Sequence, residues 1–368
     1  MHINRSETVL DLSFGDIRGG PHPAIRKYVS ELALDVWEGY VPSGGLRELR
    51  ERLAEHLQSA YEHTTITADH IMVTNGASAA LAVIYSLLKN KTVLIPNPGF
   101  PLYHKLLSQM DIAYEQYPLH TENNWSETLL MLEQKLQQGA SAVIWNFPNN
   151  PLGIVPPPEV VEQFCALCKT YKALCISDEV YRDFAGGQPF YSPARWLPEQ
   201  TLLVYSFSKA FAMAGARLGC IVGHPLMIRT LMSRSWNTSM SAPSFSQRAA
   251  LYALTYYADY PCTLSAQILG TIEKAHQLLR NANVPFYACK AGIFVCLDIS
   301  QLNVSAAEFA VLIYKKYQIL VMTGSEFGEQ AQQMIRLSMG ADEQRVLCAV
   351  QNISHLYHEI ITNQEAIT

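Results

Sequence analysis

The residues best suited to chemistry lie in the segment SFSKAFAMAGARLG, residues 206–219, which contains Lys209 and Arg217. The segment follows the apolar run Thr201–Ser206, so Lys209 is expected at the carboxyl end of a buried strand, where α/β sheets bind ligands. A lysine there is costly to desolvate and its pKa shifts readily, which suits a nucleophile that forms a Schiff base. For an isolated Ser-x-Ser-Lys, a surface lysine in a serine-rich turn is the alternative. Arg217, eight residues later, favours an anion site beside the lysine.

The segment Val73–Ser78 joins a short predicted strand to the start of an apolar helix. Its Gly76, Ala77 and Ser78 present backbone N–H groups and a hydroxyl at a helix N-terminus, which favours binding of a phosphate. Asn and Ser are also ordinary capping residues, so this segment alone does not establish a phosphate site.

An acidic residue, Asp178, follows directly after the apolar run Ala173–Ser177 and begins the sequence DEVY, which ends at Tyr181. A carboxylate at the end of a buried strand is costly unless it meets a cation. The protonated ring nitrogen of a cofactor would be such a cation. The alternative is that Asp178 caps a helix.

Two proline-rich turns also follow apolar runs. Asn150 lies in NFPNNPLG, residues 146–153, and Phe100 lies in PNPGFPLY, residues 96–103. Asn-Pro and Gly are frequent in plain turns. An aromatic ring at a strand end can stack on a planar ligand, or it can simply belong to the core.

The elements that would position these residues alternate between strands and helices. Five short apolar runs without strict alternation suit strands buried on both faces of a mainly parallel sheet. They are Thr92–Pro96, Ala142–Phe147, Ala173–Ser177, Thr201–Ser206 and Leu218–Gly223. Helical patterns at Ser78–Leu88 and Glu159–Lys172 lie between them. This order predicts an α/β fold in which helices flank the sheet.

The C-terminal part of the chain has a different pattern, in which long helices alternate with single strands. The helices are expected at Gln267–Asn281, Ala306–Tyr317 and Glu343–Ile361, and the strands at Gly292–Asp298 and Ile335–Ser338. This predicts a smaller α+β domain that the first residues of the chain complete. At about 150 residues per domain, we expect a large domain at residues 38–270 and a small domain built from residues 1–37 and 271–368.

The composition is that of a protein with a large core. Hydrophobic residues make up 49% of the 368 residues and charged residues 16%, against about 25% charged in typical domains, which excludes disorder. The formal net charge of −5 does not indicate a nucleic-acid partner. No apolar run approaches the roughly 18 residues of a membrane helix. Glu7 and Asp11 stand where a signal peptide would be apolar, so we expect a cytoplasmic protein whose cysteines are mostly free thiols.

Taken together and in this order, the segments resemble pyridoxal-phosphate enzymes of fold type I, in the class I/II aminotransferase family. The resemblance extends from about Gly15 to Gly340, and its most specific parts are SFSKAFAMAGARLG, NFPNNPLG and DEVY. It implies pyridoxal 5′-phosphate as the cofactor of the large domain, an amino acid as the substrate and a homodimer with shared active sites.

The resemblance implies a role for each matching residue around the cofactor ring. Lys209 would hold the cofactor as an internal aldimine and later move a proton between the substrate and the cofactor. Asp178 would keep the pyridinium nitrogen protonated, so that the ring remains an electron sink. Asn150 and Tyr181 would hydrogen-bond to the phenolic oxygen, and Phe100 would stack on the ring.

The resemblance also assigns a phosphate site. Its residues on the same subunit would be Gly76, Ala77, Ser78, Ser206, Ser208 and Arg217. Tyr40 matches a family tyrosine that reaches the phosphate across a dimer interface.

On the substrate side, Arg336 matches the arginine that binds the α-carboxylate, and a guanidinium suits this role because it can make two parallel hydrogen bonds to a carboxylate. The resemblance also places Asn150 at the substrate. The N-terminal loop FGDIRGG, residues 14–20, matches a loop that contacts substrate in such enzymes and places Gly15 and Asp16 there. Asp16 could face a cationic or polar side chain, and a solvated turn residue is the alternative. The sequence departs from the family pattern at Leu152, where Thr is usual, and at Ala216, which replaces a common larger residue.

A metal site is not expected. Cys165 and Cys168 have CxxC spacing, but they fall inside a predicted helix and no second pair lies at zinc spacing. Cys289 and Cys296 also lack further ligands, and the eleven histidines form no cluster. We interpret these cysteines as small buried side chains.

The first functional hypothesis is an aminotransferase that acts on a small amino acid and a 2-keto acid. The second is elimination, replacement or cyclisation of an amino acid on the same scaffold, as in capreomycidine-synthase-like cyclases. The residues around the cofactor are shared, so the motifs do not separate these two. A non-catalytic module of a fused regulator would need a DNA-binding domain, and neither end of the chain contains a basic helix-turn-helix segment.

Overall fold

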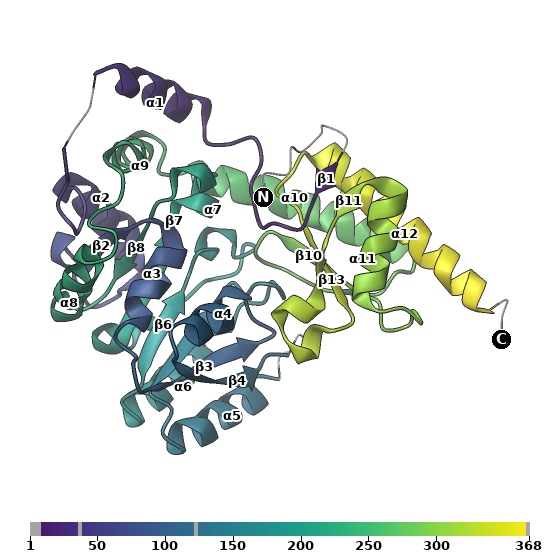
Figure 1. Ribbon diagram of the computed structural model, residues 1–368, viewed down its shortest axis with the longest axis horizontal. Coiled ribbons are helices and arrows are strands. Elements are labelled where there is room, and N and C mark those ends of the chain that lie inside the picture. Colours follow the sequence, from purple (N-terminus) through teal and green to yellow (C-terminus); the bar gives the residue numbers. More distant parts are fainter. Residues whose placement is uncertain (1–8, 36–38, 121–123, 366–368) are drawn as a thin grey trace.

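The structure is a computed structural model that describes residues 9–35, 39–120 and 124–365. Its larger part is a seven-stranded sheet between two layers of helices, and its smaller part is a four-stranded antiparallel sheet covered by helices (Figure 1). The fold class expected from the sequence is confirmed. Glu7 and the expected domain boundary at residues 37 and 38 lie outside the described residues.

The strands of the large sheet are short and almost completely buried in its centre. In spatial order they are β2 (Ile71–Thr74), β8 (Gly219–Val222), β7 (Thr201–Ser206), β6 (Leu174–Asp178), β5 (Ala142–Asn146), β3 (Thr92–Asn97) and β4 (Ala113–Pro118). The pairs from β7 to β4 are parallel, whereas β8 runs antiparallel to both β2 and β7. All five expected strands are present. An unbroken apolar run does not encode strand direction, so the reversal at β8 has no signal in the sequence.

Helices cover both faces of this sheet. One layer contains α3 (Gly76–Tyr85), α4 (Leu102–Gln109) and α8 (Pro225–Trp236), and the other contains α2 (Arg47–Leu57), α5 (Trp125–Gln137), α6 (Pro158–Thr170) and α9 (Ser244–Tyr256). Successive strand residues point to opposite layers. In β6, Cys175 packs with the cluster of α5 and α6, and Ile176 packs with the cluster of α3 and α4. Both faces are therefore apolar, which is why these strands lack an alternating pattern.

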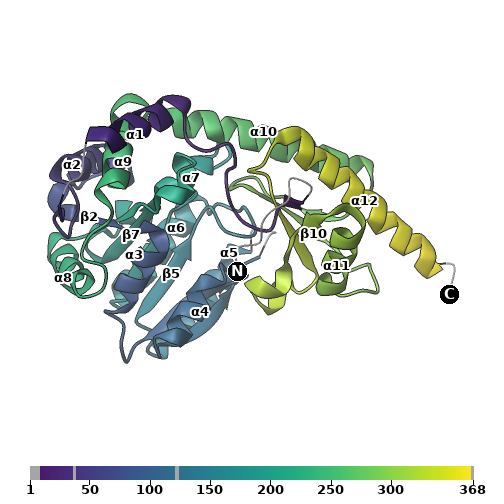
Figure 2. The ribbon, with the colours of Figure 1, turned by 45° about the horizontal axis from the view of Figure 1, so that its top comes forward.

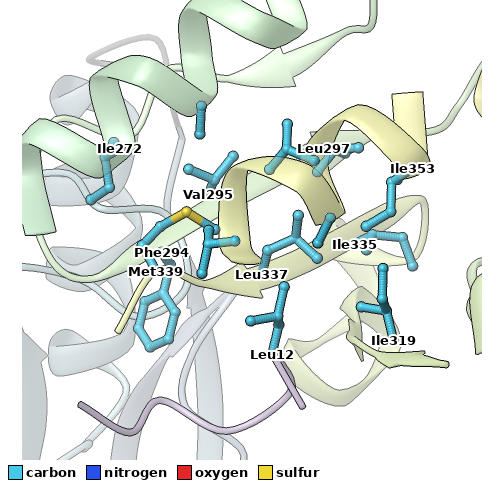
Figure 3. Close-up of a cluster of buried hydrophobic side chains, with 14 of the residues drawn as sticks. Leu12, Ile272, Phe294, Val295, Leu297, Ile319, Ile335, Leu337, Met339 and Ile353 are labelled. Carbon is cyan, nitrogen blue, oxygen red and sulfur yellow. The ribbon is translucent and has the colours of Figure 1, made fainter. Parts of the chain in front are cut away.

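The small sheet has its own core (Figure 3). Its strands in spatial order are β12 (Met322–Thr323), β13 (Met334–Ser338), β10 (Phe294–Asp298) and β9 (Phe286–Tyr287). The helices of this part are α10 (Tyr260–Asn281), α11 (Ala306–Tyr317) and α12 (Glu343–Glu365). In Figure 2, α10 extends from the large sheet to the small one. It begins seven residues before the expected start at Gln267.

The N-terminal segment contacts both parts of the molecule. Strand β1 (Leu10–Asp11) pairs in parallel with β11 (Ile319–Leu320), and Leu12 packs in the small core. Helix α1 (Pro23–Asp35) places Ile25 in the core of the large sheet. The division at residues 38–270 stays a prediction. Within the described ranges, no helix is both long enough and apolar enough to span a membrane.

Candidate active site

A cavity of about 590 Å³ lies at the carboxyl ends of the parallel strands, between the two sheets. This volume is typical of small-molecule sites. We call it the catalytic cavity. Its wall contains Gly15, Asp16, Ala77, Ser78, Phe100, Asn150, Asp178, Tyr181, Ser206, Ser208, Lys209, Arg217 and Arg336. The structure therefore gathers in one place most of the residues singled out in the sequence. Gly76 packs against the Arg217 guanidinium.

Lys209 lies on the one-turn helix α7 (Phe207–Ala210), directly after β7. The Ser206 hydroxyl caps this helix by accepting a hydrogen bond from the Ser208 N–H at 3.1 Å. The Lys209 ammonium donates to the carbonyl oxygen of Gly15. Burial lowers the pKa of Lys209 to about 8, and the nearby Asp16 carboxylate opposes this effect. A substantial fraction of the amine is therefore neutral near pH 8 and can act as a nucleophile.

Asp178 is only 3% exposed at the end of β6. The Tyr103 hydroxyl donates to its Oδ2 at 2.6 Å, and the Val180 N–H donates to its Oδ1 at 3.3 Å. Burial raises the pKa of Asp178 to about 6, even though the Tyr103 hydrogen bond acts in the opposite direction. No ion pair joins Asp178 to a described basic side chain. A cationic group of a ligand would therefore offset the cost of burying this carboxylate.

Tyr103 is a site residue for which the sequence predicts no function. It lies on the first turn of α4, three residues after Phe100, and the two rings meet edge-on at 5.6 Å between centroids. Burial raises the pKa of Tyr103 well above its usual value, so this phenol stays a hydrogen-bond donor. The spacing of three residues in PNPGFPLY places both rings on one side of a turn, but no local pattern indicates that Tyr103 meets Asp178.

Arg336 lies on β13, opposite Cys296 of β10, and is 3% exposed. Its guanidinium donates to the Asn150 side-chain oxygen at 2.8 Å and to the carbonyl of Ser13. The guanidinium carbon stands 4.1 Å from the centre of the Phe294 ring. Burial lowers the pKa of Arg336 to about 10, so the side chain remains cationic at neutral pH. Its Nε has no hydrogen-bond partner within the described chain.

The start of α3 and the Arg217 side chain form a single anion-binding corner. Gly76 begins α3 with φ of +80°, and a Cβ at this position would lie 2.9 Å from the Arg217 guanidinium. Arg217 itself adopts a left-handed conformation with φ of +50°. The free N–H groups of Ala77 and Ser78, the hydroxyls at the start of α7 and this guanidinium suit a phosphate.

Three other predicted residues differ in how closely they approach this centre. Tyr181 is buried, and the Lys209 ammonium stands 5.9 Å from its ring centre. A Cβ at Gly15 would lie 2.8 Å from Phe294 and 3.0 Å from the Tyr181 hydroxyl, so the close approach of the loop requires glycine. Tyr40 does not contribute to the cavity wall and is 84% exposed.

The residues present fit pyridoxal phosphate. The corner at Gly76 and Arg217 suits its phosphate, the buried Asp178 carboxylate suits its protonated ring nitrogen, and Lys209 suits its aldehyde. Among the described residues, no group of three or more His, Cys, Asp and Glu side chains could hold a metal ion.

Comparisons with known proteins agree with this geometry. The family described as "Aminotransferase class I and II" matches residues 7–353. An aspartate aminotransferase of Pyrococcus horikoshii is 25% identical, over 95% of this chain and 91% of its own length. An arginine–pyruvate transaminase of Pseudomonas aeruginosa is 26% identical, over 94% of this chain and 90% of its own. The solved structure of an aromatic aminotransferase from Pyrococcus horikoshii OT3 has the same fold, with a TM-score of 0.89 at 24% identity, covering 96% of this chain and 97% of its own.

Proposed function

This chain belongs to the class I and II aminotransferase family and is a pyridoxal-phosphate-dependent aminotransferase, and from that premise we propose that Lys209 is the residue that carries the cofactor. The observation that supports this most is its pKa of about 8 in a cavity that also contains a buried carboxylate and an anion-binding corner. When bound, the cofactor supplies an electron sink for the bonds at the substrate's α-carbon.

We propose that the other residues of the catalytic cavity bind the cofactor and the substrate, orient them and hold or move protons. Asp178 would hold a proton on the ring nitrogen, and Tyr103 would fix the orientation of that carboxylate. Arg336 would bind the α-carboxylate of the substrate. The Lys209 amine would then accept the α-proton and return it at the cofactor's reactive carbon, which is general acid–base catalysis by one group. Support for these roles comes from the contacts of Asp178 and Arg336 described above.

We propose transamination of an amino acid with a 2-keto acid as the reaction. The curated relatives are aminotransferases, which favours this reaction over elimination or cyclisation. The test is a panel of single amino acids, in which absorbance reports conversion of the loaded enzyme to the amino form of its cofactor. Conversion with stoichiometric release of a 2-keto acid is the expected result. Release of ammonia, or of a cyclic product, without that conversion would overturn the proposal.

We propose that the enzyme is a homodimer in which Tyr40 completes the partner's phosphate site. Support comes from the 84% exposure of this tyrosine and from the low charged fraction of 16%, because homodimer interfaces are apolar. Mixing subunits of the variants Lys209→Ala and Tyr40→Ala tests this. Each variant alone should be nearly inactive. Refolding them together should restore roughly a quarter of wild-type activity, because about half of the dimers are mixed and each mixed dimer regains one of its two sites. No recovery on mixing would contradict the shared site.

We also propose that the enzyme is cytoplasmic. All eight cysteines are free thiols, and six of them are buried, which suits a reducing compartment.

A further inference from the structure

A second cavity, of about 640 Å³, adjoins the catalytic cavity. The two share Asp16 and Ala214 as wall residues, so these two residues stand at the border between the cavities. The second cavity lies between the N-terminal loop, helix α1, the segment after α7 and helix α9. Nothing in the proposed transamination chemistry uses this space.

The wall of the second cavity is made mainly of apolar and small residues. Its larger members include Ile17, Pro21, Val29, Met213 and Phe245. A Cβ built on Gly19, Gly20 or Gly215 would meet no atom within 4 Å, so the space beside each of these glycines is open. Ala216, on the same wall, contributes only a methyl group. The small side chain at this position leaves room that a larger one would fill.

The wall contains four polar side chains, and two of them, Arg18 and Ser246, have partners within the chain. Arg18 donates to the carbonyl of Asp11 at 2.7 Å and lies 3.9 Å from its carboxylate. The Ser246 hydroxyl donates to the carbonyl of Ala216 at 2.7 Å. Arg26 is exposed, and Asp16 stands at the junction with the catalytic cavity. Apart from Asp16 and Arg26, the surface offered to a ligand is therefore largely apolar.

We propose that the second cavity is the subsite for the side chain of the amino-acid substrate, and that the preferred substrate is an amino acid with a long, largely apolar side chain. The inference rests on the proposed function, because Arg336 and Lys209 must fix the α-carbon end of the substrate in the catalytic cavity. The side chain then passes Asp16 and Ala214 and reaches the wall that contains Ala216.

The test is a chain-length series on the loaded enzyme, measured in two ways. The first is conversion of the cofactor by alanine, norvaline, norleucine and 2-aminooctanoate. The second is binding of straight-chain carboxylates from butanoate to decanoate, which needs no turnover. Once the chain passes Asp16, each further methylene should tighten binding about fourfold, the equivalent of its transfer out of water. Equal affinity across the carboxylates would overturn the inference.

Two variants would each reduce the volume of the second cavity, from opposite walls. Ala216→Leu fills it beside α7, and Val29→Phe fills it from α1, at a position away from the phosphate corner. In both, the ratio of long-chain to short-chain affinity should fall by at least about tenfold. The second variant keeps the test valid if Ala216→Leu disturbs Arg217. Ala307→Leu, on the exposed face of α11, is the matched control and should keep the wild-type series.

The outcomes separate this inference from the proposed function. If no amino acid converts the cofactor, the proposed function fails. If short amino acids convert it and chain length has no effect, the proposed function stands and the subsite is wrong. A preference for arginine and lysine over neutral chains of the same length that persists in Asp16→Ala would also contradict an apolar subsite.

Discussion

The catalytic cavity has two walls that are held in different ways. The sheet wall comprises the residues at the ends of β5, β6 and β7, and short-range hydrogen bonds shape its turns, although Asp178 and Lys209 also bond to the distant Tyr103 and Gly15. The Ser208 N–H donates to Ser206, two residues away, and the Asn150 N–H donates to Asn146, four residues away. The facing wall comprises residues 13–16, Phe327 and Arg336. The bond from Arg336 to Asn150 of the sheet wall spans 186 residues, and the bond from Arg336 to Ser13 within the facing wall spans 323.

This difference separates two tasks. Short-range turns at the ends of buried strands place Lys209 and Asp178, so the cofactor site depends on local sequence and on the sheet. The position of Arg336 depends on how the small sheet packs against the large one. Variants of the sheet wall should therefore impair cofactor binding, and variants of the facing wall should change substrate affinity while the cofactor stays bound.

The largest effect is expected at Asp178. Asp178→Asn would leave a buried cationic ring nitrogen without its partner, which costs about 3–5 kcal/mol and weakens cofactor binding by roughly 10²–10⁴-fold. Spectroscopic titration of the apo-enzyme with pyridoxal phosphate measures this. Asp259→Asn, at the start of α10 and away from the cavity, is the control. A cofactor affinity of Asp178→Asn close to the wild-type value would contradict the role of the sheet wall.

On the facing wall, Arg336→Lys should raise KM for the amino acid and leave the cofactor affinity unchanged. Lysine keeps the charge but cannot make two parallel hydrogen bonds, and loss of one charged hydrogen bond at about 1.5–3 kcal/mol raises KM roughly 10–100-fold. Arg280→Lys, in an exposed ion pair on α10, should match wild type. Loss of the cofactor from Arg336→Lys would show that the two walls do not act separately.

A pH dependence follows from Lys209. Because the pKa of Lys209 is lowered to about 8 and the neutral amine is the nucleophile, attachment of the cofactor to the apo-enzyme should accelerate as pH rises. Between about pH 7 and about pH 9 the rate should increase about tenfold and then level off. Stopped-flow absorbance gives this profile. A rate that does not change over this range would mean that a different group reacts.

The smallest effect is expected at Asp16, on the facing wall. This carboxylate is half-buried, and its interaction with a substrate cation is screened by water, so Asp16→Ala should lower the rate ratio of lysine to norleucine by about two- to fivefold. Asp16→Glu, which retains the charge, should keep the ratio near wild type. An unchanged ratio in Asp16→Ala would exclude a role for this residue in selecting the substrate side chain.

The same contrast explains what the sequence predicted. The expected strand at Thr201–Ser206 coincides with β7, and the motifs at strand ends meet in one cavity, because the carboxyl ends of parallel strands share an edge of the sheet. The edge strand β4 had no signal, since Glu115 and Gln116 interrupt AYEQYP and only Tyr117 in it is buried. The Tyr103–Asp178 hydrogen bond joins residues 75 apart, and the second cavity arises where four distant segments meet. No periodicity or local spacing records such contacts.

The central claim is that Lys209 carries the cofactor. The most direct test reduces the loaded enzyme with borohydride, digests it and identifies the labelled peptide by mass spectrometry. The label should lie on Lys209, and Lys209→Ala should incorporate none, whereas Lys274→Ala, in an exposed ion pair with Glu343, should be labelled as fully as wild type. A label on any other lysine, or full labelling of Lys209→Ala, would contradict the account.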